Sequence, residues 1–501
     1  MSFSLPNGYR QRVGHDFYLD IPGEWTYQPD VYALAHFLAD RCGAKYIIDI
    51  GCGSGGKLKP MAAIYDLIGI DSLAGIELAK KNLPSALLIE FDLEKGLPHL
   101  DPELVKNGIV ICSDVIEHLQ TPEYLMKALA NLSQLAQFVL ISTPDRDRAR
   151  GWLDDGPPEN PAHVMEWGAS EFVRFMRDCG FAEEPFYGHT INTDFHRAKT
   201  TLLTISGTHA RFKQAQTSIR VAAIIHVYNE LDIITEVIEH LLSQGVEVHI
   251  FDNWSNDGTW EALESLAKCG KIANLERFPS VPTEDYQWHS QLEKTQEYAV
   301  TLDADWIMHH DADEIRVSPW EKATLQQAFN HIDFLGYNAV DFTVIDFRFL
   351  AKNLTPKKPY QQNLTHFEFG RRPGHFLQIK AWKNNKNIEL ASSGGHEAIF
   401  NDRKIFPFKF LLKHYPLRTQ AQAEEKVFKN RLPRFGKEQR QYNWHTQYNK
   451  FQHEATIAGW DTKVLTAWHQ KLFMTEFLVE RLSGIGLSDH GAVPNDGVTD
   501  V

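Results

Sequence analysis

Residues 46–56 read YIIDIGCGSGG, an apolar run that ends in a glycine-rich turn. Such a run is typical of a buried β-strand, and we expect a helix after the turn, as in an α/β unit. Gly51, Gly53 and Gly56 fit the GxGxxG spacing of nucleotide-binding turns. This spacing is a weak signal by itself, because a plain tight turn is the alternative.

Asp49, two residues before the first glycine, discriminates between ligands. A carboxylate at this position repels a pyrophosphate but attracts a cationic amine. Two more acids follow the next strands of the pattern: Asp71 is placed for ribose hydroxyls, and Asp92 for an adenine amino group. The arrangement favours S-adenosylmethionine, whose amine and sulfonium are both cationic, over a dinucleotide.

The fourth predicted strand is followed by SDVIEHL, residues 113–119. DIGCGSG and DVIEHL together resemble class I S-adenosylmethionine-dependent methyltransferases, across about residues 25–207. The resemblance implies a Rossmann-like sheet with cofactor contacts at Asp49, Gly51, Gly53, Asp71, Asp92 and Asp114. An NAD-dependent sugar oxidoreductase is the alternative, which Asp49 and DVIEHL disfavour.

Two histidines of this half are candidate catalytic residues. The resemblance extends to Glu117 and His118 after the fourth strand, and to His163 in a Pro- and Gly-rich loop. A neutral imidazole suits removal of a hydroxyl proton as a methyl group transfers, so His163 is the expected base. The structural alternatives are a helix-capping or core role for His118 and a loop-anchoring hydrogen bond for His163.

A second α/β pattern begins with VAAIIHVYNE, residues 221–230, and contains DWIMHHDADE at 305–314. In an extended segment residues i and i+2 point to one face, so Asp311 and Asp313 should converge. Carboxylate oxygens in an open site suit Mg²⁺ or Mn²⁺, which in turn bind phosphate oxygens. Without an ion these acids repel one another, which predicts a weakly ordered site in the absence of ligand.

YNE, the turn FDNWSNDGT at 251–259 and DWIMHHDADE occur in an order that resembles GT-A glycosyltransferases of the family 2 type, over about residues 219–430. The resemblance implies nucleotide-sugar contacts at Tyr228, Glu230, Asp252 and Asp311. It also implies a site for Mn²⁺ or Mg²⁺ formed by Asp311, Asp313 and His414. A partly buried structural histidine is the alternative for His414.

The base that deprotonates the acceptor in such an enzyme has no clean motif here. Glu397 in SGGHEAIF, residues 393–400, is the first choice, because flexible glycines place it in a loop, and Asp341 and Asp346 are the alternatives. We expect Arg418 and Lys426 either to neutralise a leaving diphosphate or to lie on a helix surface.

A length of 501 residues predicts more than one domain. The fold class is α/β, with a Rossmann-like sheet, a GT-A nucleotide-sugar-binding domain and a C-terminal helical segment. The predicted divisions are a methyltransferase domain over 1–208, a linker over 209–218, a GT-A domain over 219–430, a helical extension over 431–487 and a disordered tail over 488–501. A helix is also expected near Pro319, with Ser318 as its cap.

The net charge of −14 argues against a nucleic-acid partner. Residues 401–450 nevertheless carry twelve Lys and Arg against four Asp and Glu. This segment is either a solvated surface or a surface for a lipid diphosphate or an acidic membrane. Five scattered cysteines and no long apolar run predict a cytoplasmic protein without a spanning helix, at most at the inner membrane surface.

The predicted function is therefore bifunctional. One half transfers a sugar from a nucleotide-sugar, in a metal-dependent and inverting reaction, and the other O-methylates a glycan or lipid-linked glycan in surface polysaccharide biosynthesis. Fusion raises the local concentration of a shared intermediate. The missing base motif leaves one alternative from another class, a methyltransferase with a degenerate carbohydrate-binding or scaffolding domain. No pattern predicts the oligomeric state.

Overall fold

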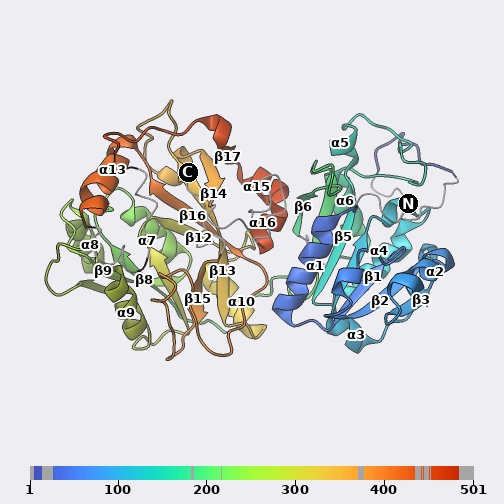
Figure 1. Ribbon diagram of the computed structural model, residues 1–501, viewed down its shortest axis with the longest axis horizontal. Coiled ribbons are helices and arrows are strands. Elements are labelled where there is room, and N and C mark those ends of the chain that lie inside the picture. Colours follow the sequence, from blue (N-terminus) through green and yellow to red (C-terminus); the bar gives the residue numbers. More distant parts are fainter. Residues whose placement is uncertain are drawn as a thin grey trace. The chain divides into compact units, whose positions relative to one another are not determined.

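The computed structural model describes residues 5–13, 26–181, 186–215, 217–370, 377–434, 442, 444, 451 and 453–483. It divides into two compact units (Figure 1). The first unit holds the described residues up to Arg211 and those from Gln470 onward, and the second runs from Phe212 to His469. The division falls inside the stretch predicted as a linker. The predicted tail, 488–501, lies outside the described residues.

The first unit is built on a seven-stranded sheet of order β3-β2-β1-β4-β5-β7-β6. Its strands are β1 (Tyr46–Ile50), β2 (Asp66–Asp71), β3 (Leu87–Glu90), β4 (Gly108–Ser113), β5 (Phe138–Pro144), β6 (Phe186–Thr190) and β7 (Thr201–Ser206). The first five strands are parallel, and β7 runs antiparallel between β5 and β6. The chain order reverses between β1 and β4, which is where open α/β sheets bind their ligands.

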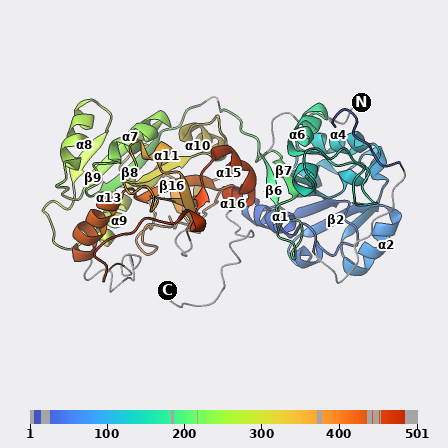
Figure 2. The same ribbon diagram turned by 90° about the horizontal axis from the view of Figure 1, so that it is seen from above.

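Helices cover both faces of this sheet. They are α1 (Pro29–Cys42), α2 (Leu73–Asn82), α3 (Pro102–Lys106), α4 (Pro122–Leu132), α5 (Arg146–Ala149), α6 (Ala169–Asp178), α15 (Gln470–Glu476) and α16 (Leu478–Ser483). Leu129 of α4 and Phe175 of α6 pack into one apolar core against the sheet, and α1 lies on the opposite face (Figure 2).

The two last helices join the first unit rather than the unit that precedes them in sequence. Helix α15 approaches β6 where Gly188 leaves room, because a Cβ at Gly188 would lie 2.5 Å from the carbonyl oxygen of Thr475. Arg148 also forms an ion pair with Glu476 at 2.7 Å. The C-terminal helices therefore pack against β6, the edge strand of the first sheet.

The second unit holds a ten-stranded sheet system in which β10-β9-β8-β11 are parallel and β15 then pairs with β11 in the antiparallel direction. Its strands are β8 (Val221–Val227), β9 (Val246–Asp252), β10 (Asn274–Arg277), β11 (Trp306–Asp311), β12 (Glu314–Val317), β13 (Ala339–Arg348), β14 (His366–Phe369), β15 (Ile379–Lys383), β16 (Phe410–Leu417) and β17 (Thr466–Ala467). The chain order reverses between β8 and β11, the position that corresponds to the ligand crevice of the first unit.

The described helices of the second unit are α7 (Ile234–Ser243), α8 (Thr259–Lys268), α9 (Trp288–Ala299), α10 (Leu325–Phe334), α11 (Tyr360–Asn363) and α13 (Gln420–Glu424). A π-helical segment, Glu425–Arg431, continues α13. Within the described part of the chain, each helix is too short or too polar to span a bilayer.

Two local predictions are wrong. The glycine turn leads into a single 3-10 turn, Lys59–Met61, instead of a helix. Helix α10 begins at Leu325 and not near Pro319, because Thr324 caps it by accepting the N–H of Gln327. Ser318 instead donates its hydroxyl to the carbonyls of Trp320 and Ala323 and so holds the preceding loop.

Candidate functional sites

A cavity of about 600 Å³ opens at the carboxyl ends of the central strands of the first unit. Seven of the eight residues predicted for this half line it: Gly51, Gly53, Asp71, Asp92, Asp114, His118 and His163. Asp49 does not line the cavity; it is buried behind the turn and accepts a hydrogen bond from the Tyr32 hydroxyl at 3.1 Å. The fold therefore brings residues that are up to more than a hundred positions apart in sequence to one cavity.

The turn after β1 requires glycine at its first position. Gly51 has a φ of 77°, and a Cβ there would lie 2.3 Å from a methyl carbon of Val115. The N–H of Gly53 donates to Asp71 at 2.8 Å, which ties the turn to the end of β2. The other Asp71 oxygen accepts the N–H of Ser72 at 2.7 Å, so the carboxylate has a fixed orientation at the cavity wall.

Asp114 follows β4 in a left-handed conformation, with a φ of 53°. Such a conformation costs a non-glycine residue about 1–3 kcal/mol and is concentrated at functional sites. Neutral groups hold the carboxylate: the Gln28 amide donates at 2.8 Å and the Ser142 hydroxyl at 3.1 Å. Burial raises the pKa of Asp114, an effect that the positive charge of Lys57 opposes. Gln28 and Lys57 carry no motif by which the sequence alone could have identified them.

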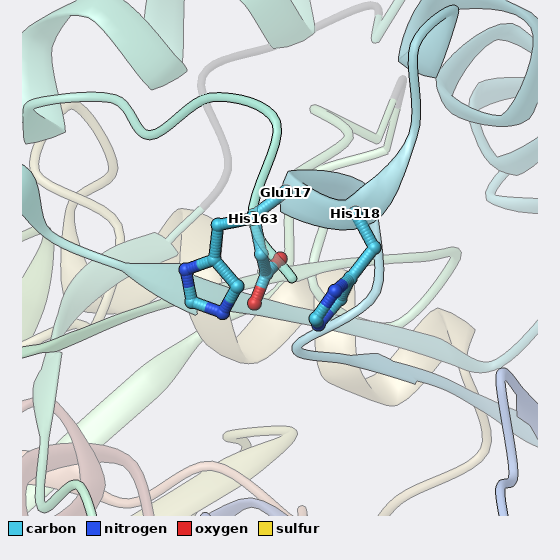
Figure 3. A group of neighbouring side chains, drawn as sticks. All are labelled: Glu117, His118 and His163. Carbon is cyan, nitrogen blue, oxygen red and sulfur yellow. The ribbon is translucent and has the colours of Figure 1, made fainter. Parts of the chain in front are cut away.

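Glu117 and the two histidines lie together beside this carboxylate (Figure 3). Glu117 is fully buried, and its burial together with the charge of Asp114 raises its pKa well above the ordinary value. The rings of His118 and His163 meet edge to face with their centroids 4.8 Å apart. One potential metal-ligand atom from each of the three residues lies within 4.8 Å of the others.

Hydrogen bonds orient both rings. His118 uses Nδ1 to contact the carbonyl oxygen of Ala162 at 2.9 Å, which requires that Nδ1 carry the proton. His163 Nδ1 lies 2.5 Å from Glu166, whose other oxygen pairs with Arg150 at 2.7 Å. Each of these contacts favours a proton on Nδ1, and the Asn160 amide lies 2.9 Å from Nε2 of His163. The His118 ring contacts a loop carbonyl and not a helix end, and His163 is bonded to Asn160 and Glu166 of its own loop, which agrees with its loop-anchoring alternative.

In the second unit, HHDADE spans the end of β11 and the start of β12. His309 and His310 are fully buried, and burial lowers the pKa of each ring well below its ordinary value, so both are neutral core residues. Asp311 accepts a hydrogen bond from Lys380 at 2.6 Å, and Asp313 from Lys426 at 2.8 Å. The two acids of the pair are thus bonded to two different lysines.

Further basic groups complete this charge network. Arg418 is fully buried and binds Glu230 at 2.5 Å and Asp232 at 2.7 Å. Lys426 also contacts Glu230, at 2.6 Å. The alternative that Arg418 and Lys426 lie on a helix surface is therefore wrong: both side chains point into the site and hold its acids.

His414 lies between two acids. Its Nδ1 is 2.7 Å from Asp346, and its Nε2 is 3.6 Å from Asp313. Burial alone would favour the neutral ring, but Asp313 and Asp346 together raise the pKa of His414 to about 10. Without a bound ion, these two acids therefore favour the imidazolium form of the ring.

This arrangement does not fit an open divalent-metal site. Both predicted carboxylate ligands are bonded to lysine, and the predicted histidine ligand is protonated. The expected repulsion among the acids is relieved by the chain's own cations, so it gives no reason for weak order. A metal ion would have to displace Lys426 from Asp313 or take a proton from His414.

The predicted nucleotide contacts lie at the ends of β8 and β9. Asp252 is fully buried, accepts the N–H of Ser255 at 3.0 Å and leaves its Oδ2 without a partner in the described structure. Arg434, which the sequence did not identify, stacks over the Tyr228 ring at 4.1 Å. Asn229 and Trp254, next to these residues, are left-handed, as Asp114 is after β4.

The three candidate bases make different contacts in the structure. Glu397 pairs with Arg403 at 2.5 Å, and Asp341 is buried against Lys409 at 2.9 Å. Asp346 directly contacts His414 and so belongs to the same network as Asp313. Glu397 stays a prediction, and Asp346 is the alternative with a contact to the site.

Comparison with known families agrees with the geometry of both units. A methyltransferase domain model matches residues 27–184, and a glycosyl transferase family 2 model matches residues 222–378. The chain joins a methyltransferase domain to a family 2 glycosyltransferase domain. The predicted family memberships, the α/β fold and the transferase classes are confirmed, and S-adenosylmethionine is the cofactor that the methyltransferase domain implies.

Individual relatives match the methyltransferase domain. A probable S-adenosylmethionine-dependent methyltransferase of Mycobacterium tuberculosis is 27% identical over 173 residues, which are 34% of this chain and 60% of the relative. A ubiquinone biosynthesis O-methyltransferase of Chromobacterium violaceum is 30% identical over 144 residues, which are 26% of this chain and 59% of the relative. The chain thus spans about three fifths of the length of these relatives.

One solved structure, the methyltransferase domain of bacterial CtHen1-CN, is 19% identical. It covers 36% of this chain and 98% of its own, with a TM-score of 0.28. The family assignment of the methyltransferase domain depends on the sequence matches.

Proposed function

We propose that this chain is a bifunctional enzyme of surface polysaccharide or glycolipid biosynthesis. The glycosyltransferase domain transfers a sugar from a nucleotide-sugar, and the methyltransferase domain O-methylates a glycan or lipid-linked glycan. The supporting observation is that each unit places acids and a left-handed residue at the carboxyl ends of its parallel strands, beside the point where strand order reverses. An oxygen acceptor agrees with the relatives named as O-methyltransferases.

In the methyltransferase domain we assign S-adenosylmethionine to the part of the cavity lined by Gly51, Gly53, Asp71 and Asp92. His118 and His163 line the same cavity, from the segment after β4 and the loop before α6. We assign to these histidines the end of the cavity where the acceptor hydroxyl loses its proton. Glu166 fixes the orientation of His163 for this task.

In the glycosyltransferase domain, Asp252 and Tyr228 are assigned to the nucleobase. The unpartnered Oδ2 of Asp252 supports this role, since a buried acceptor without a partner costs about 1–3 kcal/mol unless a ligand donates to it. Asp311 and Asp313 mark the diphosphate end, beside Lys380, Lys426 and Arg418. We derive no step through a metal ion here, because the paired acids and the protonated His414 do not fit one.

The family resemblance nevertheless predicts dependence on Mn²⁺ or Mg²⁺, and this prediction can be tested directly. Nucleoside diphosphate binding to the full chain is measured by calorimetry with Mn²⁺ and again with EDTA. Equal affinity in both solutions would overturn the predicted metal requirement. A loss of at least tenfold with EDTA would support the requirement, and the ion would then have to displace Lys426 from Asp313 or take a proton from His414.

The two activities are separated with one variant in each domain. Asp311→Asn should abolish sugar transfer and spare methyl transfer, and Asp71→Asn should weaken S-adenosylmethionine binding and spare sugar transfer. A thermal-shift screen of nucleotide-sugars identifies the donor, because a ligand at a thousand times its dissociation constant stabilises a protein by about 4 kcal/mol. Loss of both activities in either variant would contradict independent sites.

Contact of residues 401–450 with an anionic lipid carrier stays a prediction. The segment lies partly outside the described residues, and several of its cations are bonded within the domain. Arg403 pairs with Glu397, Lys409 with Asp341, and Arg418 with Glu230. Fewer positive charges therefore face outward than the sequence count suggests.

A further inference from the structure

Glu117, His118 and His163 form a donor set of the kind that binds transition metals. Two imidazoles and one carboxylate, with further coordination positions open to substrate, are typical of catalytic divalent-metal sites. The three potential ligand atoms lie within 4.8 Å of one another, and Figure 3 shows the rings and the carboxylate pointing toward a common space. No other such group of three is found among the described residues.

The surroundings of each donor agree with this use. A metal-binding histidine commonly donates its other ring N–H to a backbone carbonyl or a carboxylate. His118 does so to the carbonyl of Ala162 at 2.9 Å, and His163 to the carboxylate of Glu166 at 2.5 Å. Both rings thus direct Nε2 away from these partners.

Glu117 supplies a second, independent observation. Its side chain is fully buried; Oε2 accepts a hydrogen bond from Thr143 at 3.1 Å, and Oε1 has no partner in the described structure. A buried carboxylate oxygen without a donor is costly, and a bound cation would remove that cost. One bond would have to yield, since the Asn160 amide lies 2.9 Å from His163 Nε2.

We propose that Glu117, His118 and His163 bind a divalent transition-metal ion at the acceptor end of the methyltransferase cavity, where the ion holds the acceptor through adjacent oxygen atoms. The inference deepens the proposed methyl transfer and rests on it for the identity of the substrate. His118 and His163 line the cavity, so an ion between them would face the bound acceptor. A vicinal diol or an ortho-dihydroxy ring offers two such oxygens.

The role of the ion is to stabilise the deprotonated form of the acceptor hydroxyl. The metal-bound hydroxyl releases its proton to solvent, and its oxygen attacks the methyl carbon of S-adenosylmethionine. The carbon–sulfur bond breaks with its electron pair on sulfur, which leaves the methyl ether and neutral S-adenosylhomocysteine. In this scheme His163 binds the ion and is not the base, and Glu166 is a positioning residue that acts through His163.

The test uses the full chain, freed of metal by dialysis against a chelator and titrated with Co²⁺. Calorimetry measures affinity, and the visible absorption of Co²⁺ reports nitrogen ligation without any need for turnover. We expect His118→Ala and His163→Ala to weaken Co²⁺ binding at least tenfold and to change the spectrum. His36→Ala, which changes an exposed histidine of the same domain that contacts Tyr65, is the control and should bind as the wild type does. Asp311→Asn should also retain this site.

Equal Co²⁺ affinity in the wild type and in His118→Ala would overturn the proposal, as would the absence of binding to the wild type at millimolar Co²⁺. If His118→Ala does not fold, His118→Gln is used instead, because its side-chain volume is closer to that of histidine. It is judged by the same Co²⁺ spectrum. S-adenosylmethionine affinity is measured in parallel. Failure of the wild type to bind S-adenosylmethionine would refute the proposed methyl transfer while leaving the Co²⁺ result to decide the metal site.

Discussion

The two ligand sites of this chain lie at equivalent places in two α/β sheets but treat their acids in opposite ways. In the methyltransferase domain neutral donors hold two of the cavity acids: Ser72 and Gly53 bind Asp71, and Gln28 and Ser142 bind Asp114. In the glycosyltransferase domain lysines bind Asp311 and Asp313 directly.

The difference matches the ligands that the two families use. A cavity in which neutral groups hold Asp71 and Asp114 is suited to a cationic cofactor and, as we infer, to a divalent ion. A site in which cations already balance the acids is stable without ligand and does not repel a diphosphate. The same position in a sheet therefore serves ligands of opposite charge, and the neighbours of the acids make the difference.

The largest expected effect concerns the charge network of the glycosyltransferase domain. Arg418→Met should lower the free energy of unfolding by about 3–5 kcal/mol, because it leaves Glu230 and Asp232 without their buried partner. Chemical denaturation, followed by tryptophan fluorescence, measures the loss. Arg220→Met removes an arginine whose pair with Asp303 is exposed, and should leave the transition unchanged. Equal effects of the two variants would contradict a buried network.

The second largest expected effect is the pH dependence of stability that His414 gives to the glycosyltransferase domain. The pKa of His414 is raised to about 10, so its stabilising contribution is present in full below about pH 6.5 and is lost as the pH rises through about 10. The wild type should lose about 4 kcal/mol more than His414→Gln between these limits. Parallel curves for the two proteins would show that the ring is not charged in the folded state.

The third expected effect is smaller and is confined to the methyltransferase domain: it is a loss of cofactor affinity when Gly51 is replaced. Gly51→Ala should weaken S-adenosylmethionine binding about ten- to a hundredfold, because the new methyl group would collide with Val115 and shift the turn. Gly43→Ala is the matched control, with a φ of 66° but no atom within 4 Å of the added Cβ. Calorimetric titration should find wild-type affinity in this control; a similar loss in both would assign the effect to backbone conformation and not to the collision.

The smallest expected effect is at the exposed end of the same cavity. Asp92 is half exposed and pairs with Lys95 at 3.1 Å. Solvent screens such a group, so Asp92→Asn should weaken S-adenosylmethionine binding only a few-fold. The same titration measures it, and a loss as large as that of Gly51→Ala would mean that Asp92 becomes buried when the cofactor binds.

The sequence by itself determined the two domain families, the α/β class and most of the residues that meet in each site. These features are encoded locally: apolar runs predict strands, glycine predicts the turn, and acids at strand ends converge wherever parallel strands end together. The local signals failed where competing caps were close in sequence, as for Ser318 and Thr324.

Only the tertiary structure decided which cation neutralises which acid. Lys380 and Lys426 lie 69 and 113 residues from the aspartates they bind, and no local pattern links them. The same holds for Gln28, which reaches Asp114 across 86 residues, and for the C-terminal helices that complete the first sheet. The charge state of a site depends on the side chains that the whole topology brings within a few ångströms, because the interaction between charges falls with distance in space and not in sequence.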